Sequence, residues 1–200
     1  IQGPMILRAL YLTDLAHAAI FGLDDREPVP LSHPKANLAR SVAVAVLESN
    51  LNETSPGKFS LDTGPLTDFL CRETKFSTDP SLPWACTGFL VAPDLIATAG
   101  HCMVNTGESR HEKDKYCAAF RWLFDYQADF PREEISKDRL FECKEVIYAI
   151  REEQAPFRDF ALVRLNRPVP GRIPLTLASA PVQPKNTFTM IGFPFGTPAK

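Results

Sequence analysis

One histidine stands in a sequence context suited to proton transfer. His101 lies near the end of the stretch Cys86 to Cys102, CTGFLVAPDLIATAGHC, between a glycine and a cysteine. Two short apolar runs flank the turn signal Pro93-Asp94, which predicts two strands joined by a tight turn. Such a hairpin would bring Cys86 and Cys102 close enough to bridge. The bridge would hold His101 at a strand end, fixed and partly exposed, where an imidazole can serve as a general base.

An aspartate opens a second informative stretch, DFALVRL, at residues 159–165. A carboxylate next to buried positions is costly unless something hydrogen-bonds it. By itself, an aspartate at a strand start is usually a cap or a turn acceptor. Together with His101, Asp159 indicates a base and its orienter. Acyl transfer by a hydroxyl nucleophile needs an imidazole to remove the proton and a carboxylate to fix the tautomer. Only closeness in space matters, so a separation of 58 positions is no obstacle.

The composition excludes several classes of function. The chain has 200 residues, 44% of them hydrophobic, and a net charge of -2, so we expect no nucleic-acid partner. No apolar run approaches the roughly 20 residues of a membrane span. The charged stretch 105–115 is expected to be a solvated loop. Its possible ligands match no metal template, and we expect no metal or cofactor; these residues are Glu108, His111, Glu112 and Asp114.

The chain has five cysteines, which is many for a cytosolic protein. Besides the first pair, Cys117 and Cys143 lie on strand-like stretches and could form a second bridge. Cys71 is then left over, and two interpretations of it are equally weighted. It is either a buried free thiol or bonded to a polypeptide absent from this sequence. The cysteine content favours an oxidising compartment, so we expect a secreted or periplasmic protein.

Apolar patterning predicts mostly short strands. The eighteen prolines against ten glycines favour an all-β or loop-rich fold. Residues 6–19 have a helical spacing and are expected to form a short pro-segment helix, behind a possible cloning remnant at 1–4. Residues 48–82 are expected to form a long connection. The aromatic residues of 118–126 alternate on one face of a predicted core strand. Further strands are expected at 41–47, 144–150, 159–165 and 188–191.

These stretches resemble a known family. CTGFLVAPDLIATAGHC resembles the catalytic-histidine motif of the trypsin/chymotrypsin superfamily of serine peptidases, and DFALVRL resembles its catalytic-aspartate motif. TMIGFPFGTPAK is similar to the strand and loop that open the second barrel of that fold. Three other segments, IFGLDDREPV, CAAFRWLFDY and FECKEVIYAI, resemble a bacterial branch near the glutamyl endopeptidases. The resemblance covers about residues 20–200.

The resemblance implies an all-β, chymotrypsin-like double Greek-key barrel, of which this chain holds the first barrel and the opening strand of the second. The expected parts are an N-terminal extension or pro-segment (1–19), the first barrel (20–167), an interlobe linker (168–186) and the first strand and loop of the second barrel (187–200). It also implies His101 as general base, Asp159 as its orienting carboxylate and a Cys86 to Cys102 disulfide. The implied activity is that of a serine endopeptidase, which hydrolyses protein or peptide substrates. The resemblance also implies that the enzyme is made as a zymogen.

One departure from the family pattern is large. No GDSGG-like motif occurs, and no serine follows Ser179. The nucleophile, oxyanion hole and specificity pocket are therefore expected on a C-terminal companion segment, either beyond residue 200 or on a second chain after cleavage near Lys200. Two alternatives remain open. One is a non-catalytic homologue acting as a binding or regulatory module, against which the intact His101 and Asp159 argue. The other is a peptidase with a cysteine nucleophile.

Overall fold

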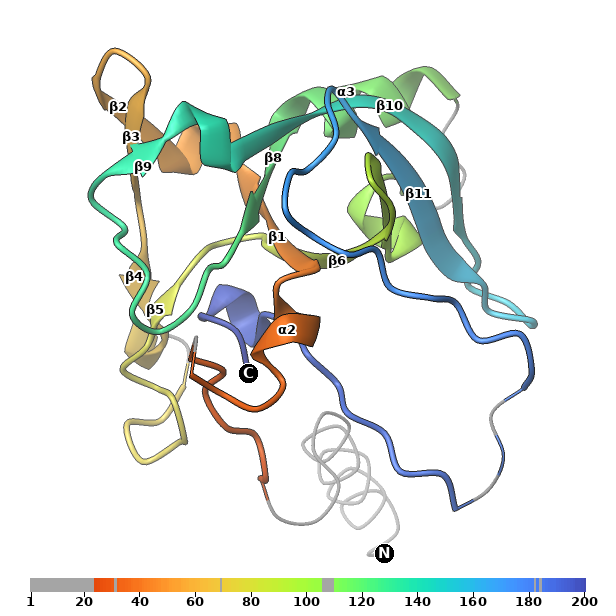
Figure 1. The fold of residues 1–200 in the computed structure, drawn as a ribbon, viewed down its shortest axis with the longest axis horizontal. Helices are drawn as coiled ribbons and strands as arrows, with labels where there is room; N and C mark the ends of the chain where they lie inside the picture. The colour runs from red at the N-terminus through yellow and green to blue at the C-terminus, as the bar shows by residue number, and fades with distance from the viewer. Residues whose placement is uncertain (1–23, 31, 69, 106–109, 182, 184) are drawn as a thin grey trace, which may run out of the picture.

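The computed structural model describes residues 24–200 except 31, 69, 106–109, 182 and 184; the side chains of 68 and 110–114 are also left undescribed (Figure 1). The predicted pro-segment at 1–19 and its helix at 6–19 lie outside the described residues. None of the helices in the described part of the chain has the length and apolar character needed to cross a bilayer.

Six antiparallel strands close into a barrel in the order β1-β6-β7-β11-β10-β8 (Figure 1). This arrangement confirms the predicted all-β fold and is consistent with a chymotrypsin-like barrel. The strands are β1 (Val42–Leu47), β6 (Cys86–Ala92), β7 (Leu95–Thr98), β8 (Phe120–Phe124), β10 (Leu140–Arg151) and β11 (Asp159–Leu165).

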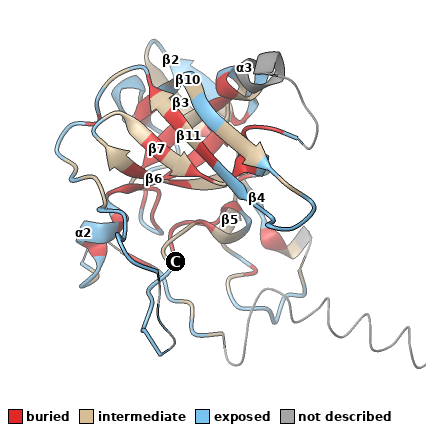
Figure 2. Ribbon diagram, turned by 90° about the vertical axis from the view of Figure 1, so that its right-hand side faces the viewer, coloured by how far each residue is buried: buried red, intermediate tan, exposed pale blue. Residues whose placement is uncertain are grey.

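The barrel wall is buried on both faces along β1, because its side chains alternate between two cores. Ala43 and Ala45 point to the interior cluster, which also holds Trp122 and Val163. Val42, Val44 and Val46 belong to an outer cluster with residues from both ends of the described chain. Figure 2 shows the resulting buried positions along the strands. Successive side chains of a strand point to opposite faces, so one apolar run can serve both clusters.

The aromatic stretch 118–126 differs from its prediction in two ways. Residues 118 and 119 belong to helix α3 (Arg110–Ala119), which also replaces much of the loop expected at 105–115. Strand β8 ends at Phe124 because Asp125 has a positive φ of 61°. This turn places Tyr126 in the outer cluster rather than beside Trp122 in the barrel interior.

The long connection expected at 48–82 contains short strands. β2 (Leu51–Ser55) and β3 (Lys58–Leu61) form a hairpin, and β3 also pairs with β9 (Ile135–Ser136). β4 (Gly64–Pro65) pairs with β5 (Pro80–Ser81). The remaining regular elements are short: the helix α2 (Ala36–Ala39) and the single turns η1 (Glu48–Asn50), η2 (Leu66–Asp68), η3 (Gly100–Cys102), η4 (Lys137–Arg139) and η5 (Pro194–Gly196).

The C-terminal segment of the described chain packs on the barrel instead of forming the strand predicted at 188–191. No strand is assigned there among the described residues, since a strand needs a neighbour for its backbone groups. Beyond it, Gly192 and Lys200 exchange backbone hydrogen bonds of 3.2 and 3.0 Å. The Lys200 side chain is only 2% exposed and pairs with Asp79 at 2.8 Å.

Candidate active site

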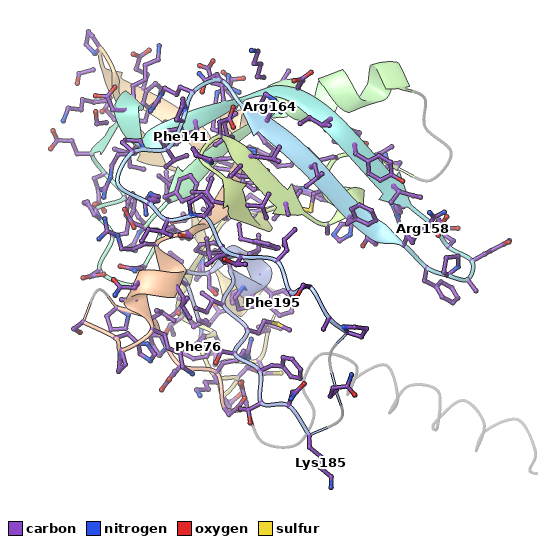
Figure 3. All side chains as sticks on the ribbon, turned by 45° about the vertical axis from the view of Figure 1, so that its right-hand side comes forward. Phe76, Phe141, Arg158, Arg164, Lys185 and Phe195 are labelled. Atoms are coloured by element: carbon purple, nitrogen blue, oxygen red, sulfur yellow. A yellow bond between two sulfur atoms is a disulfide. The ribbon has the colours of Figure 1, made fainter. Side chains whose placement is uncertain are left out.

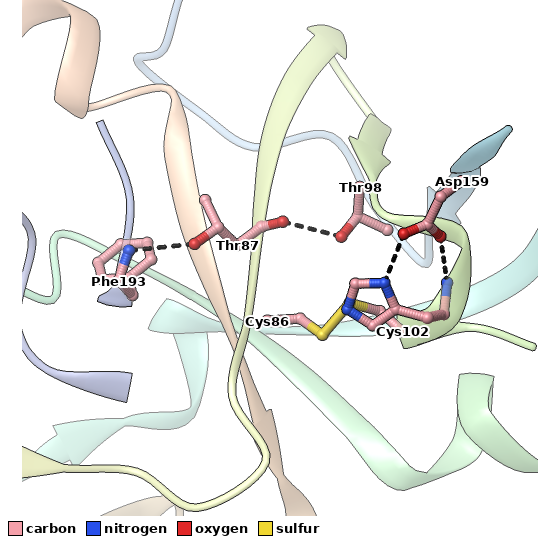
Figure 4. Close-up of a disulfide and its surroundings, with 7 residues drawn as sticks. Cys86, Thr87, Thr98, Cys102, Asp159 and Phe193 are labelled. Atoms are coloured by element: carbon pink, nitrogen blue, oxygen red, sulfur yellow. Dashed lines mark hydrogen bonds and ion pairs between the residues drawn. A yellow bond between two sulfur atoms is a disulfide. The ribbon is translucent and has the colours of Figure 1, made fainter. Parts of the chain in front are cut away.

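The β6–β7 hairpin positions His101. β7 ends at Thr98, and the single turn η3 that follows carries the histidine. A disulfide between Cys86 and Cys102, with a Cα–Cα distance of 6.3 Å, ties this turn to the start of β6 (Figure 4). The His101 side chain remains 53% exposed. The histidine is thus held through its backbone while its ring stays open to solvent.

Barrel closure brings Asp159 to the histidine. β11 pairs with β7, with Ala161 opposite Thr98, so the first residue of β11 extends past the end of β7 toward η3. Both carboxylate oxygens of Asp159 then contact His101: Oδ1 accepts the backbone N–H at 2.8 Å, and Oδ2 lies 2.7 Å from ring Nδ1 (Figure 4). The two residues singled out in the sequence are therefore direct neighbours.

The contacts of Asp159 favour its charged form. Burial raises the pKa of this carboxyl, but the hydrogen bonds from the His101 ring, the His101 backbone and the Gly100 backbone outweigh burial and leave the pKa lowered. An ionised carboxylate can only accept, so it places a proton on Nδ1 of the ring. The lone pair of Nε2 is then left available to take a proton.

Gly100 allows the histidine turn to approach the β10–β11 hairpin. A Cβ on this residue would lie 1.8 Å from the carbonyl oxygen of Ile150 and 2.9 Å from the backbone nitrogen of Phe160. Both obstacles are backbone atoms, which cannot move aside as a flexible side chain can. Sequence reasoning treated Gly100 only as a small neighbour of His101. The structure makes it a position where the two backbones meet.

Two threonines connect the histidine hairpin to the C-terminal segment. The Thr98 hydroxyl donates to the Thr87 carbonyl at 2.8 Å, and the Thr87 hydroxyl accepts the backbone N–H of Phe193 at 3.0 Å (Figure 4). Sequence reasoning missed both threonines. Their only signal was the presence of hydroxyl groups within two apolar strands. They join the strand end that precedes η3 to a segment about a hundred positions away.

The structure describes three of the remaining candidate residues, all of them cysteines. Cys117 and Cys143 form a second disulfide, which joins helix α3 to β10. Cys71 is exposed and forms no disulfide within the described part of the chain, so the interpretation as a buried thiol is wrong. Glu108, His111, Glu112 and Asp114 have no described side chains. Within the described residues, no hydroxyl or thiol is hydrogen-bonded to Nε2 of His101, so the arrangement offers a base and its orienter.

The comparisons with known proteins identify a family for the part of the chain that contains the candidate active site. A family model described as the trypsin-like peptidase domain matches residues 86–200. The match begins at Cys86 and includes both His101 and Asp159. No curated protein gives a significant match to the chain.

Proposed function

Because the chain belongs to the trypsin-like peptidase domain family, we propose that it is a serine endopeptidase with His101 as general base and Asp159 as its orienter. The family supports a peptidase acting on proteins or peptides. The observation that carries the finer proposal is the paired contact of Asp159, which bonds both the ring and the backbone of His101. Neither contact is needed by a module that only binds.

The proposed mechanism uses Nε2 of His101 as a proton carrier. As a serine oxygen attacks the peptide carbonyl, Nε2 takes the hydroxyl proton and the ring becomes an imidazolium. Asp159 stabilises that charge and keeps the other proton on Nδ1. Nε2 then gives its proton to the departing amine, which leaves an acyl-enzyme. Water enters, Nε2 removes its proton, and the same steps release the acid product.

We propose that the serine lies on a companion segment outside residues 1–200. Support comes from several large apolar side chains between residues 173 and 195 that are left open to solvent. Met190 is 93% exposed, Ile173 83% and Phe188 65%, and Phe195, which is labelled in Figure 3, is 61% exposed. Exposed apolar side chains along one stretch are typical of a surface that another segment covers. We further propose a bacterial, glutamyl endopeptidase-like branch and a secreted or periplasmic zymogen, in keeping with the two disulfides.

A fluorophosphonate probe tests the proposal on the full-length protein, because it phosphonylates an activated serine. We expect the wild type to be labelled and His101→Ala to lose labelling by several orders of magnitude. The exposed ring of His101 makes little packing contribution, so the circular dichroism spectrum should not change. An unlabelled wild type would indicate a non-catalytic homologue, and labelling only by a thiol-directed probe would indicate a cysteine nucleophile.

The intact mass of the purified protein tests the companion segment. A second chain, or a single chain longer than residues 1–200, would carry the expected serine. Comparing masses before and after reduction also shows whether the exposed Cys71 tethers such a chain. A catalytically competent protein with no residue beyond these 200 would refute the companion segment.

A further inference from the structure

Three side chains with metal-binding atoms meet beside the candidate active site. One ligand atom each of Cys86, Cys102 and His101 lies within 4.8 Å of the other two. Across the described residues, no other group of three or more His, Cys, Asp and Glu side chains is so close. We propose that this group is a latent zinc site, which opens when the Cys86–Cys102 disulfide is reduced and then binds Zn²⁺ through two thiolates and His101.

The opening step is a thiol–disulfide exchange with a dithiol reductant. The bond between the sulfur atoms of Cys86 and Cys102 breaks and takes up two electrons and two protons, while the dithiol loses them and becomes a disulfide. Zinc binding then releases the two thiol protons, because thiolates are the ligands. Two thiolates balance the charge of Zn²⁺, and the neutral imidazole adds none.

The observed distances suit this metal. Tetrahedral zinc with sulfur at about 2.3 Å and nitrogen at about 2.0–2.1 Å places its ligand atoms about 3.6–3.8 Å apart. The sulfur atoms separate on reduction, and the three ligand atoms already lie within 4.8 Å of one another, close to the spacing that a tetrahedral site requires. The hairpin that carries the ligands is also held without the disulfide. β6 pairs with β7, and the Thr98 hydroxyl bonds the Thr87 carbonyl.

Asp159 supplies the orienting contact that zinc-bound histidines usually have. Its Oδ2 lies 2.7 Å from Nδ1 of His101, so the proton stays on Nδ1 and Nε2 is left to bind the metal. The imidazole is 53% exposed, which leaves room for water as the fourth ligand. The group thus offers two thiolates and one imidazole as ligands, and a carboxylate that orients the imidazole.

Bound zinc would occupy the lone pair that the proposed mechanism uses. Reduction in the presence of zinc is therefore expected to withdraw the base and stop hydrolysis. This consequence rests on the proposed function. The metal site does not, because it depends only on the positions of two cysteines, one histidine and one aspartate.

Cobalt titration of the full-length protein tests the site. The protein is reduced with a water-soluble phosphine, which becomes its oxide, and the excess is removed without oxygen. We expect one Co²⁺ per chain, with thiolate charge-transfer absorption and the visible bands of tetrahedral Co²⁺, and displacement of Co²⁺ by Zn²⁺. Reduced His101→Gln should bind more than about 10-fold more weakly, and reduced Asp159→Asn about 10- to 100-fold more weakly.

Two controls separate this site from the other thiols. Oxidised wild type should bind no Co²⁺ through thiolate, and reduced Cys71→Ser should match reduced wild type. The second cysteine pair, Cys117 and Cys143, is reduced in every sample but forms no such group with a histidine among the described residues. Equal affinity in wild type and His101→Gln would overturn the proposal.

Circular dichroism provides a second measurement if the reduced protein unfolds. Zn²⁺ should then restore the native spectrum in wild type and not in His101→Gln, and failure to restore it would overturn the proposal. The peptidase proposal can fail independently of the metal site. Zinc binding at His101 with undiminished fluorophosphonate labelling would refute the catalytic role and leave the metal site standing.

Discussion

Replacing Asp159 with Asn tests how the carboxylate sets the tautomer of His101. Oδ1 of Asp159 accepts the His101 backbone N–H at 2.8 Å, and Oδ2 contacts Nδ1 at 2.7 Å. The backbone N–H always donates, so the single oxygen of the Asn amide must face it. The amide NH₂ then faces Nδ1, which can accept only when the ring proton sits on Nε2. We expect Asp159→Asn to hold the ring in the tautomer that cannot act as a base.

The expected loss of acylation rate has two parts. The tautomer that can act as a base requires the Asn amide to turn the other way, which places its NH₂ against the backbone N–H, donor to donor. This arrangement costs about 1–3 kcal/mol, so the population of the competent tautomer falls to about 1–20%. The carboxylate also stabilises the imidazolium by up to about 4 kcal/mol at about 4 Å and an effective dielectric constant near 20. Side-chain exposures of 53% and 38% reduce this part to about 1 kcal/mol. Together they lower the acylation rate by about 30- to 1,000-fold.

The assay follows the rate of acylation by a peptide ester substrate together with long-range ¹H–¹⁵N NMR spectra of the imidazole. We expect the slower acylation to coincide with movement of the ring proton from Nδ1 to Nε2. Glu145→Gln is the matched control, because it removes the same charge from β10, where Glu145 pairs with Arg164. This control should change the acylation rate by less than about 2-fold and leave the tautomer as it is.

Either of two results would refute the reasoning. A proton that stays on Nδ1 in Asp159→Asn would show that the backbone N–H does not set the amide orientation. A ring that changes tautomer while acylation slows by less than about 10-fold would show that proton removal by His101 does not limit the reaction.

Three further predictions concern stability. Tyr126→Phe removes a buried hydroxyl that has no hydrogen-bond partner among the residues that the structure describes, so urea unfolding should give an unchanged or up to about 1 kcal/mol higher free energy of unfolding; a clear loss would reveal a missed partner. Gly88→Ala would place a Cβ 2.5 Å from buried atoms of both Ile96 and Trp122, so it should lower that free energy by about 1–3 kcal/mol, and a variant as stable as wild type would contradict this packing. The hydrogen bond from the Arg26 side chain lowers the pKa of Asp24 from 3.8 to about 2, so the pair stabilises the fold above pH 3.8 and loses this effect as the pH falls through 2. Asp24→Asn should therefore be up to about 1 kcal/mol less stable than wild type at pH 7, and this difference should disappear as the pH falls through 2. A pH-independent difference would argue against the ion pair.

Local sequence patterns predicted the barrel strands and the two residues of the candidate site. β11 runs from Asp159 to Leu165 as expected, because an apolar run bounded by a polar residue and Arg167-Pro168 can hardly form anything but a short buried strand. The β6–β7 hairpin could also be predicted, since its turn signal lies between two apolar runs. These features depend on neighbours in sequence, which is why the sequence alone was enough.

Patterns that depend on distant partners were predicted less well. Tyr126 continues the aromatic alternation of β8, but the positive φ of Asp125 turns it into the outer cluster. Residues 188–191 have the composition of a strand, yet no neighbouring strand pairs with them in the described structure. Backbone pairing is a property of two segments, so the composition of one segment cannot determine it.

The sequence by itself determined which residue types are available for chemistry: one histidine after a glycine and one aspartate at the start of a strand. Only the tertiary structure decided that they meet. Closing the barrel places β11 beside β7, and Gly100 lets the histidine turn reach the β10–β11 hairpin. A contact between residues 58 positions apart depends on how the strands close, and no local pattern contains that information.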